Sequence, residues 1–172
     1  ITLAPEFGKV LHSTEPLSAG KGILYCYIGI SLGDLLAGLL AQITKSRKFT
    51  VFVFQLAIIV SSLIYLGSDG ISESKFMWIA FFMGLGVGYW ATFVTIASEQ
   101  FGTNLRSTVT TTAPNFVRGA LIPSTFLFEF FVRHYGILTA GYIMIFLLTA
   151  IAIWALSRLR ESFNKDLDYL EV

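Results

Sequence analysis

The stretch GILYCYIGISLGDLLAGLLAQI, residues 22–43, decides the fold class of this chain. Asp34 is the only charged residue in it, and most of the others are apolar. Crossing the ~30 Å hydrocarbon core of a bilayer takes roughly 20 mostly apolar residues in a helix, because the backbone must satisfy its own hydrogen bonds there. The stretch therefore predicts a transmembrane helix.

Four further stretches pass the same test. They lie at residues 49–67, 76–98, 108–132 and 136–157, with short polar connections between them. The stretch 108–132 contains Arg118 and Glu129, but its neighbours require the chain either to cross or to fold back. We predict an all-α integral membrane protein whose bundle, residues 22–158, has about five transmembrane helices.

Composition excludes several other classes of protein. The chain is 55% hydrophobic and 13% charged, against roughly 25% charged in a soluble domain. A formal net charge of +1 offers no basic surface for nucleic acid. Cys26 is the only cysteine, and the two histidines have no ligand partners at metal-binding spacing. No catalytic motif is present, so we expect neither an enzyme, nor a cofactor, nor a metal site.

The distribution of Lys and Arg predicts the orientation in the membrane. Residues 1–21 carry charges and prolines without an apolar core, and we expect them to form a loop outside the membrane, following a part of the protein that is missing. The side opposite that loop, which also holds the tail at 159–172, collects seven basic residues against four: Lys45, Arg47, Lys48, Arg106, Arg158, Arg160 and Lys165, against Lys9, Lys21, Lys75 and Arg133. This bias predicts a cytoplasmic C-terminus in a plasma or inner membrane.

Asp34 and Arg118 are the sharpest candidates for function. An ionisable group inside a span faces the bundle or water and by default marks a functional site. By residue count they lie roughly 15 and 18 Å from the cytoplasmic end of their helices. Arg118 could bind an anionic part of a substrate, and Asp34 could couple transport to a proton or cation. Alternatively, they form a structural ion pair or are satisfied by neighbouring helices.

Other candidates follow from small and polar residues. Tyr89, Trp90 and Asn115 could line a cavity or simply pack. Pro114 and Pro123 predict bends in the fourth span, which occur at binding sites and as plain packing features alike. The spacing of four glycines favours close helix packing, and these are Gly29, Gly33, Gly84 and Gly88.

Two motifs resemble those of the major facilitator superfamily. The segment GDLLAGLLAQITKSRK, residues 33–48, resembles the glycine-rich, basic-ended signature that the family carries between helices eight and nine, with Gln42 and Ile43 where the family usually has an aspartate and a basic residue. The segment EQFGTNLR, residues 99–106, resembles its acidic-then-arginine loop between helices ten and eleven. By this resemblance the spans are helices eight to twelve, in one six-helix half of a twelve-helix transporter. The resemblance also implies a cytoplasmic gating network of Lys45, Arg47, Lys48, Glu99 and Arg106.

The resemblance implies secondary active transport of a small polar solute, a sugar or an organic anion, by alternating access. One half alone should not transport, so we expect the chain to be a fragment that needs the N-terminal half of the transporter and a lipid bilayer, with a coupling proton or cation as a further candidate partner. The alternative is a non-transporting helical module, such as a pore or scaffold subunit, whose oligomer interface uses Gly29, Gly33, Gly84 and Gly88.

Overall fold

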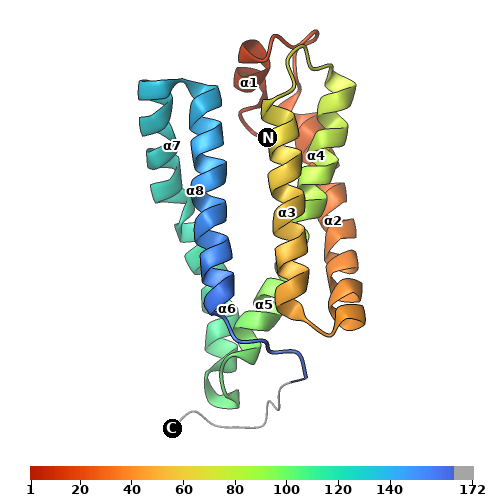
Figure 1. Cartoon of the computed structure of the whole chain (residues 1–172), viewed down its shortest axis with the longest axis vertical. Helices are drawn as coiled ribbons and strands as arrows, with labels where there is room; N and C mark the ends of the chain where they lie inside the picture. The colour runs from red at the N-terminus through yellow and green to blue at the C-terminus, as the bar shows by residue number, and fades with distance from the viewer. Residues whose placement is uncertain (165–172) are drawn as a thin grey trace.

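A computed structural model describes residues 1–164, and the regular secondary structure in that range is α-helical (Figure 1). Lys165 and most of the predicted tail lie outside the described residues. The helices are α1 Ala4–Val10, α2 Ala19–Thr44, α3 Arg47–Leu66, α4 Glu73–Val87, α5 Trp90–Glu99, α6 Thr103–Gly119, α7 Leu121–Tyr135 and α8 Ile137–Arg158.

Four helical segments are long and apolar enough to cross a membrane. They are Ala19–Thr44, Arg47–Leu66, Glu73–Glu99 and Ile137–Arg158, and the third of them joins α4 and α5. Each overlaps one of the predicted spans and differs from it by a few residues at the ends. The chain is therefore an all-α protein of the multi-pass membrane type.

The predicted span 108–132 is divided between two helices. It covers most of α6 and most of α7, which meet at Ala120. Pro123 explains the interruption, because it has no N–H to donate to the carbonyl of Gly119 one turn earlier. Neither α6 nor α7 alone has the length of a span. The predicted fifth crossing is therefore not among the four helical segments that are long enough to cross a membrane.

Serine side chains mark the starts of three long helices. The hydroxyls of Ser18, Ser46 and Ser72 accept hydrogen bonds from backbone N–H groups three residues later, at 3.1 to 3.4 Å. Each satisfies one of the N–H groups that a helix start leaves without an internal partner. With these caps, α2, α3 and α4 start two to three residues before the predicted starts of the apolar spans.

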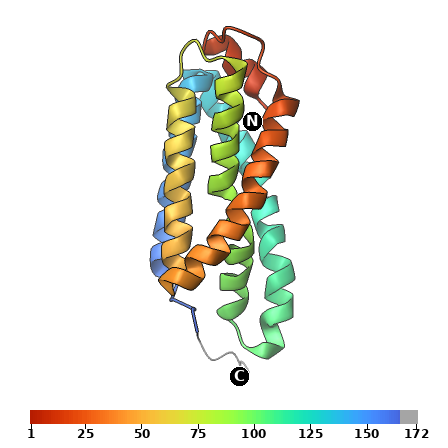
Figure 2. The same cartoon turned by 90° about the vertical axis from the view of Figure 1, so that its right-hand side faces the viewer.

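The helices form two groups that lie side by side (Figure 1). Helices α2, α3 and α4 pack together, and α2 crosses α4 obliquely (Figure 2). Helices α7 and α8 pack on each other, α8 also packs on α3, and α5 packs on α6. The start of α3, the end of α5, the start of α6 and the end of α8 all lie at one end of the molecule (Figure 1).

The N-terminal segment differs from the predicted loop. It contains α1 and packs onto the ends of α3 and α4, where Leu11 and Leu17 join Tyr65 and Phe76 in a buried cluster. Proline at the start of α1 and the apolar side chains of this short segment allow a helix without the length of a membrane span. Residues 1–21 are therefore partly helical and close one end of the bundle.

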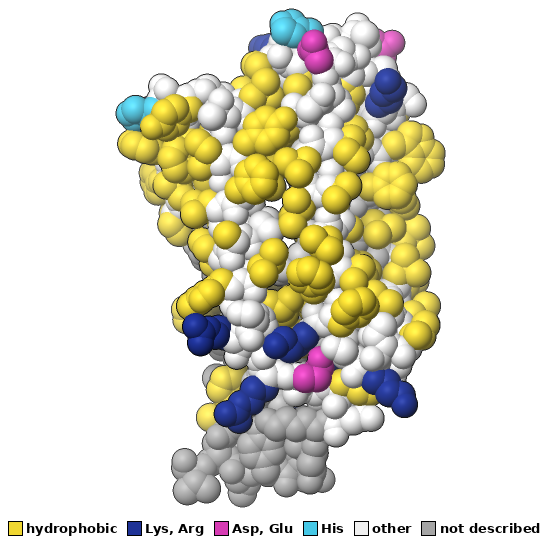
Figure 3. Space-filling view, viewed as in Figure 1, with side chains coloured by type: hydrophobic (Ala, Val, Ile, Leu, Met, Phe, Trp, Pro, Cys, Tyr) yellow, Lys and Arg dark blue, Asp and Glu magenta, His cyan; other side chains and the backbone are white. Residues whose placement is uncertain are grey.

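The surface is divided into an apolar middle and two charged ends. Hydrophobic side chains cover the long helices, whereas Lys and Arg gather at the end where α8 finishes (Figure 3). Leu35, Phe126 and Trp154 are among the many large apolar side chains that are more than half exposed, at 68%, 69% and 61%. In a bilayer such side chains face lipid, which agrees with the multi-pass membrane type.

Candidate functional site

The third span is interrupted in its middle. α4 ends at Val87 and α5 begins at Trp90, so Gly88 and Tyr89 stand between two helical segments. The Gly88 N–H still donates to the carbonyl of Gly84, whereas the Tyr89 N–H donates to Val87. The backbone N–H groups at the start of α5 therefore need acceptors from elsewhere.

A close crossing of α2 and α4 lies beside this interruption. A Cβ built on Gly84 would overlap the carbonyl oxygen of Cys26, and one on Gly88 would lie 2.5 Å from the Cα of Gly33. A Cβ on Gly29 would overlap the carbonyl oxygen of Phe81. The four glycines that we singled out from the sequence thus lie on the facing sides of α2 and α4, and only glycine permits this approach of the two backbones.

Asp34 caps the start of α5 from the neighbouring helix. Its Oδ1 accepts a hydrogen bond from the backbone N–H of Ala91 at 3.1 Å, while Tyr89 provides no side-chain cap. A carboxylate at a helix N-terminus also interacts favourably with the helix dipole. The Asp34 carboxylate is therefore hydrogen-bonded to the start of α5. Its side chain is only half-buried and remains partly exposed.

Arg118 and Asn115 lie together on α6, one turn apart. The Arg118 Nη1 donates to Asn115 Oδ1 at 3.1 Å, and Asn115 Nδ2 donates to the carbonyl of Thr111 at 3.1 Å. Both side chains are exposed. No ion pair between Asp34 and Arg118 is found in the described part of the chain, so each is satisfied by its own neighbours instead.

Tyr89 and Trp90 take part in aromatic packing beside the break. The Tyr89 ring meets Phe54 edge-on with centroids 6.4 Å apart, and the Trp90 ring lies 5.5 Å from that of Phe93. Trp90 retains 36% of its exposure. These rings fix the segment around Gly88, and neither is in hydrogen-bonding contact with Asp34 among the described residues.

An ion pair closes the end of the bundle where the basic residues gather. Arg47 holds Glu99 with two hydrogen bonds of 2.7 Å, from Nε and Nη2 to the two carboxylate oxygens. The side chains are only 18% and 10% exposed. A planar, two-bond contact of this kind is stronger and more specific than an ordinary surface pair. It ties the start of α3 to the end of α5.

Residues after α8 extend this network, and we did not identify them from the sequence. The Ser162 hydroxyl donates to Glu99 Oε2 at 2.6 Å, and Glu161 accepts from the Ser46 hydroxyl and from the backbone N–H groups of Arg47 and Lys48. Glu161 thus caps α3 from a distant part of the chain. The sequence did contain a hint of this contact. Glu161 is an acidic residue just after the last apolar run, on the same predicted side of the membrane as the basic residues at 45–48.

The ionisation of Glu161 reflects this position. Burial opposes ionisation, but hydrogen bonds from the Ser46 hydroxyl and from three backbone N–H groups outweigh it and hold the pKa of Glu161 below its usual value. The charged form is therefore the form that binds the start of α3.

The remaining network candidates lie at the same end with different surroundings. Lys48 donates from Nζ to the carbonyl of Leu159 at 2.7 Å, near the end of α8. Lys45 ends α2 in the left-handed conformation, with φ of 52°, and is exposed. Arg106 lies in the first turns of α6 and is half-buried. The structure thus brings Arg47, Lys48 and Glu99 into one linked set.

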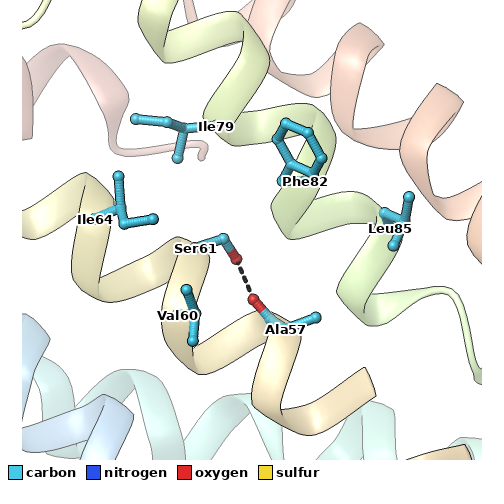
Figure 4. Close-up of a pocket in the computed structure, with 7 residues that line it drawn as sticks. All are labelled: Ala57, Val60, Ser61, Ile64, Ile79, Phe82 and Leu85. Atoms are coloured by element: carbon cyan, nitrogen blue, oxygen red, sulfur yellow. Dashed lines mark hydrogen bonds between the residues drawn. The ribbon is translucent and has the colours of Figure 1, made fainter. Parts of the chain in front are cut away.

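An apolar groove between α3 and α4 has no comparable chemistry. It has a volume of about 340 Å³ and is lined by residues such as Val60, Ile64 and Phe82 (Figure 4). Its one hydroxyl, that of Ser61, already donates to the carbonyl of Ala57 at 2.7 Å. The groove therefore offers contact area for apolar chains and no free polar group.

Within residues 1–164, no three His, Cys, Asp or Glu side chains lie close enough to hold a metal ion. Comparisons with protein-family models, with curated proteins and with solved structures find no match to this chain.

Proposed function

We propose that this chain is part of a secondary active transporter that moves a small polar solute, a sugar or an organic anion, by alternating access. One observation carries the proposal. Asn115 and Arg118, and in part Asp34, expose polar groups within helical segments that run between the two charged ends of the molecule.

Lipid is an unfavourable environment for these groups. An arginine at the centre of a bilayer costs roughly 2.5–3.5 kcal/mol on insertion scales, so such residues face protein or a water-filled cavity. No residue of α6 is buried within the described chain, although this helix carries five threonines as well as Asn115 and Arg118. A water-filled pathway along α6 satisfies these side chains without a cost in lipid.

The interrupted span supports the same proposal. Transporter sites commonly lie at broken helices, where a free helix start offers positive N–H groups to a ligand. At the start of α5, the Asp34 carboxylate accepts a hydrogen bond from one of these N–H groups, that of Ala91. We propose that Asp34 binds a coupling proton or cation, and that Arg118 binds a carboxylate or hydroxyl of the solute.

A closed pathway requires further protein. In the proposed transporter, α6 and α7 together make a fifth crossing, and a second helical bundle, the N-terminal half, covers the polar face of α6. The network of Arg47, Glu99 and Glu161 then lies on the cytoplasmic side, as the excess of basic residues at that end favours.

Uptake into vesicles tests the proposal. The whole protein is reconstituted, and uptake of glucose and gluconate, which differ by a carboxylate, is compared with that of empty vesicles. Arg118→Gln should lower gluconate uptake at least ten-fold and glucose uptake less. The matched control Arg133→Gln changes an exposed arginine near the end of α7 and should retain uptake. Absence of uptake of both solutes, or equal uptake by both variants, would contradict the assignment.

The alternative function, a scaffold or pore subunit, was expected to form oligomers through four glycines. Gly29, Gly33, Gly84 and Gly88 are buried in the crossing of α2 and α4, so they are not available to another copy of the chain. A scaffold would instead cover α6 with a partner protein, and it would show no solute uptake.

A further inference from the structure

A second cavity lies between α3, α5, α6 and α8, near the end closed by Arg47 and Glu99. It has a volume of about 430 Å³, within the usual range for small-molecule sites. Its walls are largely apolar and include Val51, Ile96 and Leu156, which form a buried cluster.

A buried acceptor lines this cavity. Gln55 is 8% exposed; its amide interacts with the hydroxyl of Tyr89, which lines the same cavity, while its side-chain oxygen Oε1 has no hydrogen-bond partner among the described residues. Buried amide oxygens are rarely left without a donor, and each exception needs an explanation. Gln55 lies eight residues after the start of α3, roughly 12 Å into the helix.

Water alone explains the cavity poorly. The volume holds on the order of ten water molecules, and each ordered water needs two to four polar partners. Only Gln55, Tyr89 and Gln100 among the lining residues carry polar side chains. An occupant with a large apolar part and one hydrogen-bond donor matches both the walls and the acceptor.

The cavity is separate from the proposed solute pathway. Val109 and Ala113 line it from α6, whereas Asn115 follows Ala113 by two residues and so points to roughly the opposite side of that helix. Filling the cavity therefore leaves the polar face of α6 unchanged.

We propose that this cavity binds a small amphipathic alcohol, with its hydroxyl donating to Gln55 Oε1 and its hydrocarbon part between α5 and α8. The groove in Figure 4 provides the internal contrast, because it is similarly apolar but has no free acceptor. The proposal does not depend on transport.

Photolabelling tests this inference. The full chain in lipid nanodiscs is irradiated with 3-azioctanol, an eight-carbon alcohol with a photoactivatable diazirine, and the adducts are mapped by mass spectrometry. We expect adducts on the cavity residues Phe93 and Phe101, and at least five-fold fewer there with the same probe lacking its hydroxyl.

Variants make the test specific. Ala152→Leu fills the cavity and should lower labelling of Phe93 and Phe101 at least five-fold, whereas Ala150→Leu, on an exposed face of the same helix, should not. Gln55→Leu should reduce labelling by the alcohol to that by the hydroxyl-free probe. Circular dichroism checks that each variant is folded. Equal labelling of these residues in Ala152→Leu, or by the two probes, would overturn the proposal.

Discussion

At the scale of single residues, Asp34 combines a structural contact with a chemistry that a transporter can use. Its carboxylate completes the start of α5, and it remains half-exposed. The structural and functional roles can be separated, because asparagine caps helices about as well as aspartate but carries no charge.

We therefore predict different effects of two substitutions at Asp34. Asp34→Ala should lower the free energy of unfolding by about 0.5–2 kcal/mol through loss of the cap, and Asp34→Asn should leave it nearly unchanged. Unfolding in mixed micelles measures both. If Asp34→Asn is as destabilising as Asp34→Ala, the charge itself holds the helix, and the capping account is wrong.

The Glu161 carboxylate predicts a dependence of stability on pH. Its pKa is lowered in the folded chain, so its stabilising effect is fully present above the unfolded value, about 4.3, and is lost as the pH falls through the lower folded value. The parent should melt at a higher temperature than Glu161→Gln from pH 7 to about 5, and the difference should shrink as the pH falls below the unfolded value.

Melting of Glu15→Gln, an exposed carboxylate at the other end of the molecule, provides the control for this pH series. It should resemble the parent at each pH. A difference between the parent and Glu161→Gln that persists unchanged at pH 3 would mean that ionisation of Glu161 does not stabilise the start of α3.

Sequence reasoning reached some of these residues and not others. Arg47 and Glu99 could be grouped because each stands at the end of an apolar run on the same predicted side. Ser162 and Glu161 could not, because they follow α8 and meet α3 only through the path of the chain beyond the helix. The partner of Asp34 is a backbone N–H, which no residue pattern identifies.

At the scale of elements, the crossing of α2 and α4 depends on the absence of side chains. Gly84 of α4 lies against the backbone of Cys26 of α2, whereas Gly38, which is also on α2, has open space where a Cβ would stand. Gly84 is therefore required for close packing, whereas Gly38 could be replaced by a larger residue without a clash.

Gly84→Ala should therefore lower the free energy of unfolding by about 1–3 kcal/mol, the usual range for overpacking. Gly38→Ala should be neutral or stabilising by up to about 1 kcal/mol, because alanine favours the helix. Both are measured by denaturation in mixed micelles. Equal effects of the two substitutions would show that the close crossing does not determine stability.

Length and apolar composition were enough to find the four long helical segments, but not the break within the third of them. The break at Gly88 lies where this residue meets Gly33, which is far away in the sequence. The division at Ala120 follows from Pro123, and the sequence did predict a bend there. The N-terminal helix α1 was missed because its apolar residues pack on other elements instead of forming a span.

At the scale of the whole molecule, an all-α membrane fold follows from composition and hydropathy alone. The arrangement in two groups does not, because it depends on which helix faces pack together. What the two groups leave uncovered is the polar face of α6, and the proposed transport function depends on what covers that face.

Chemical modification of a cysteine on that face tests this central claim most directly. Asn115→Cys is placed in a Cys26→Ala background, and Phe126→Cys, on the apolar surface of α7, serves as the control. The whole protein is reconstituted in sealed vesicles, and a membrane-impermeant thiosulfonate is added to either side. We predict that Asn115→Cys reacts from both sides, at least ten times faster than Phe126→Cys, while the vesicles stay sealed to the reagent. Equally slow reaction at both positions, or reaction from one side only, would contradict a pathway that opens alternately to the two sides.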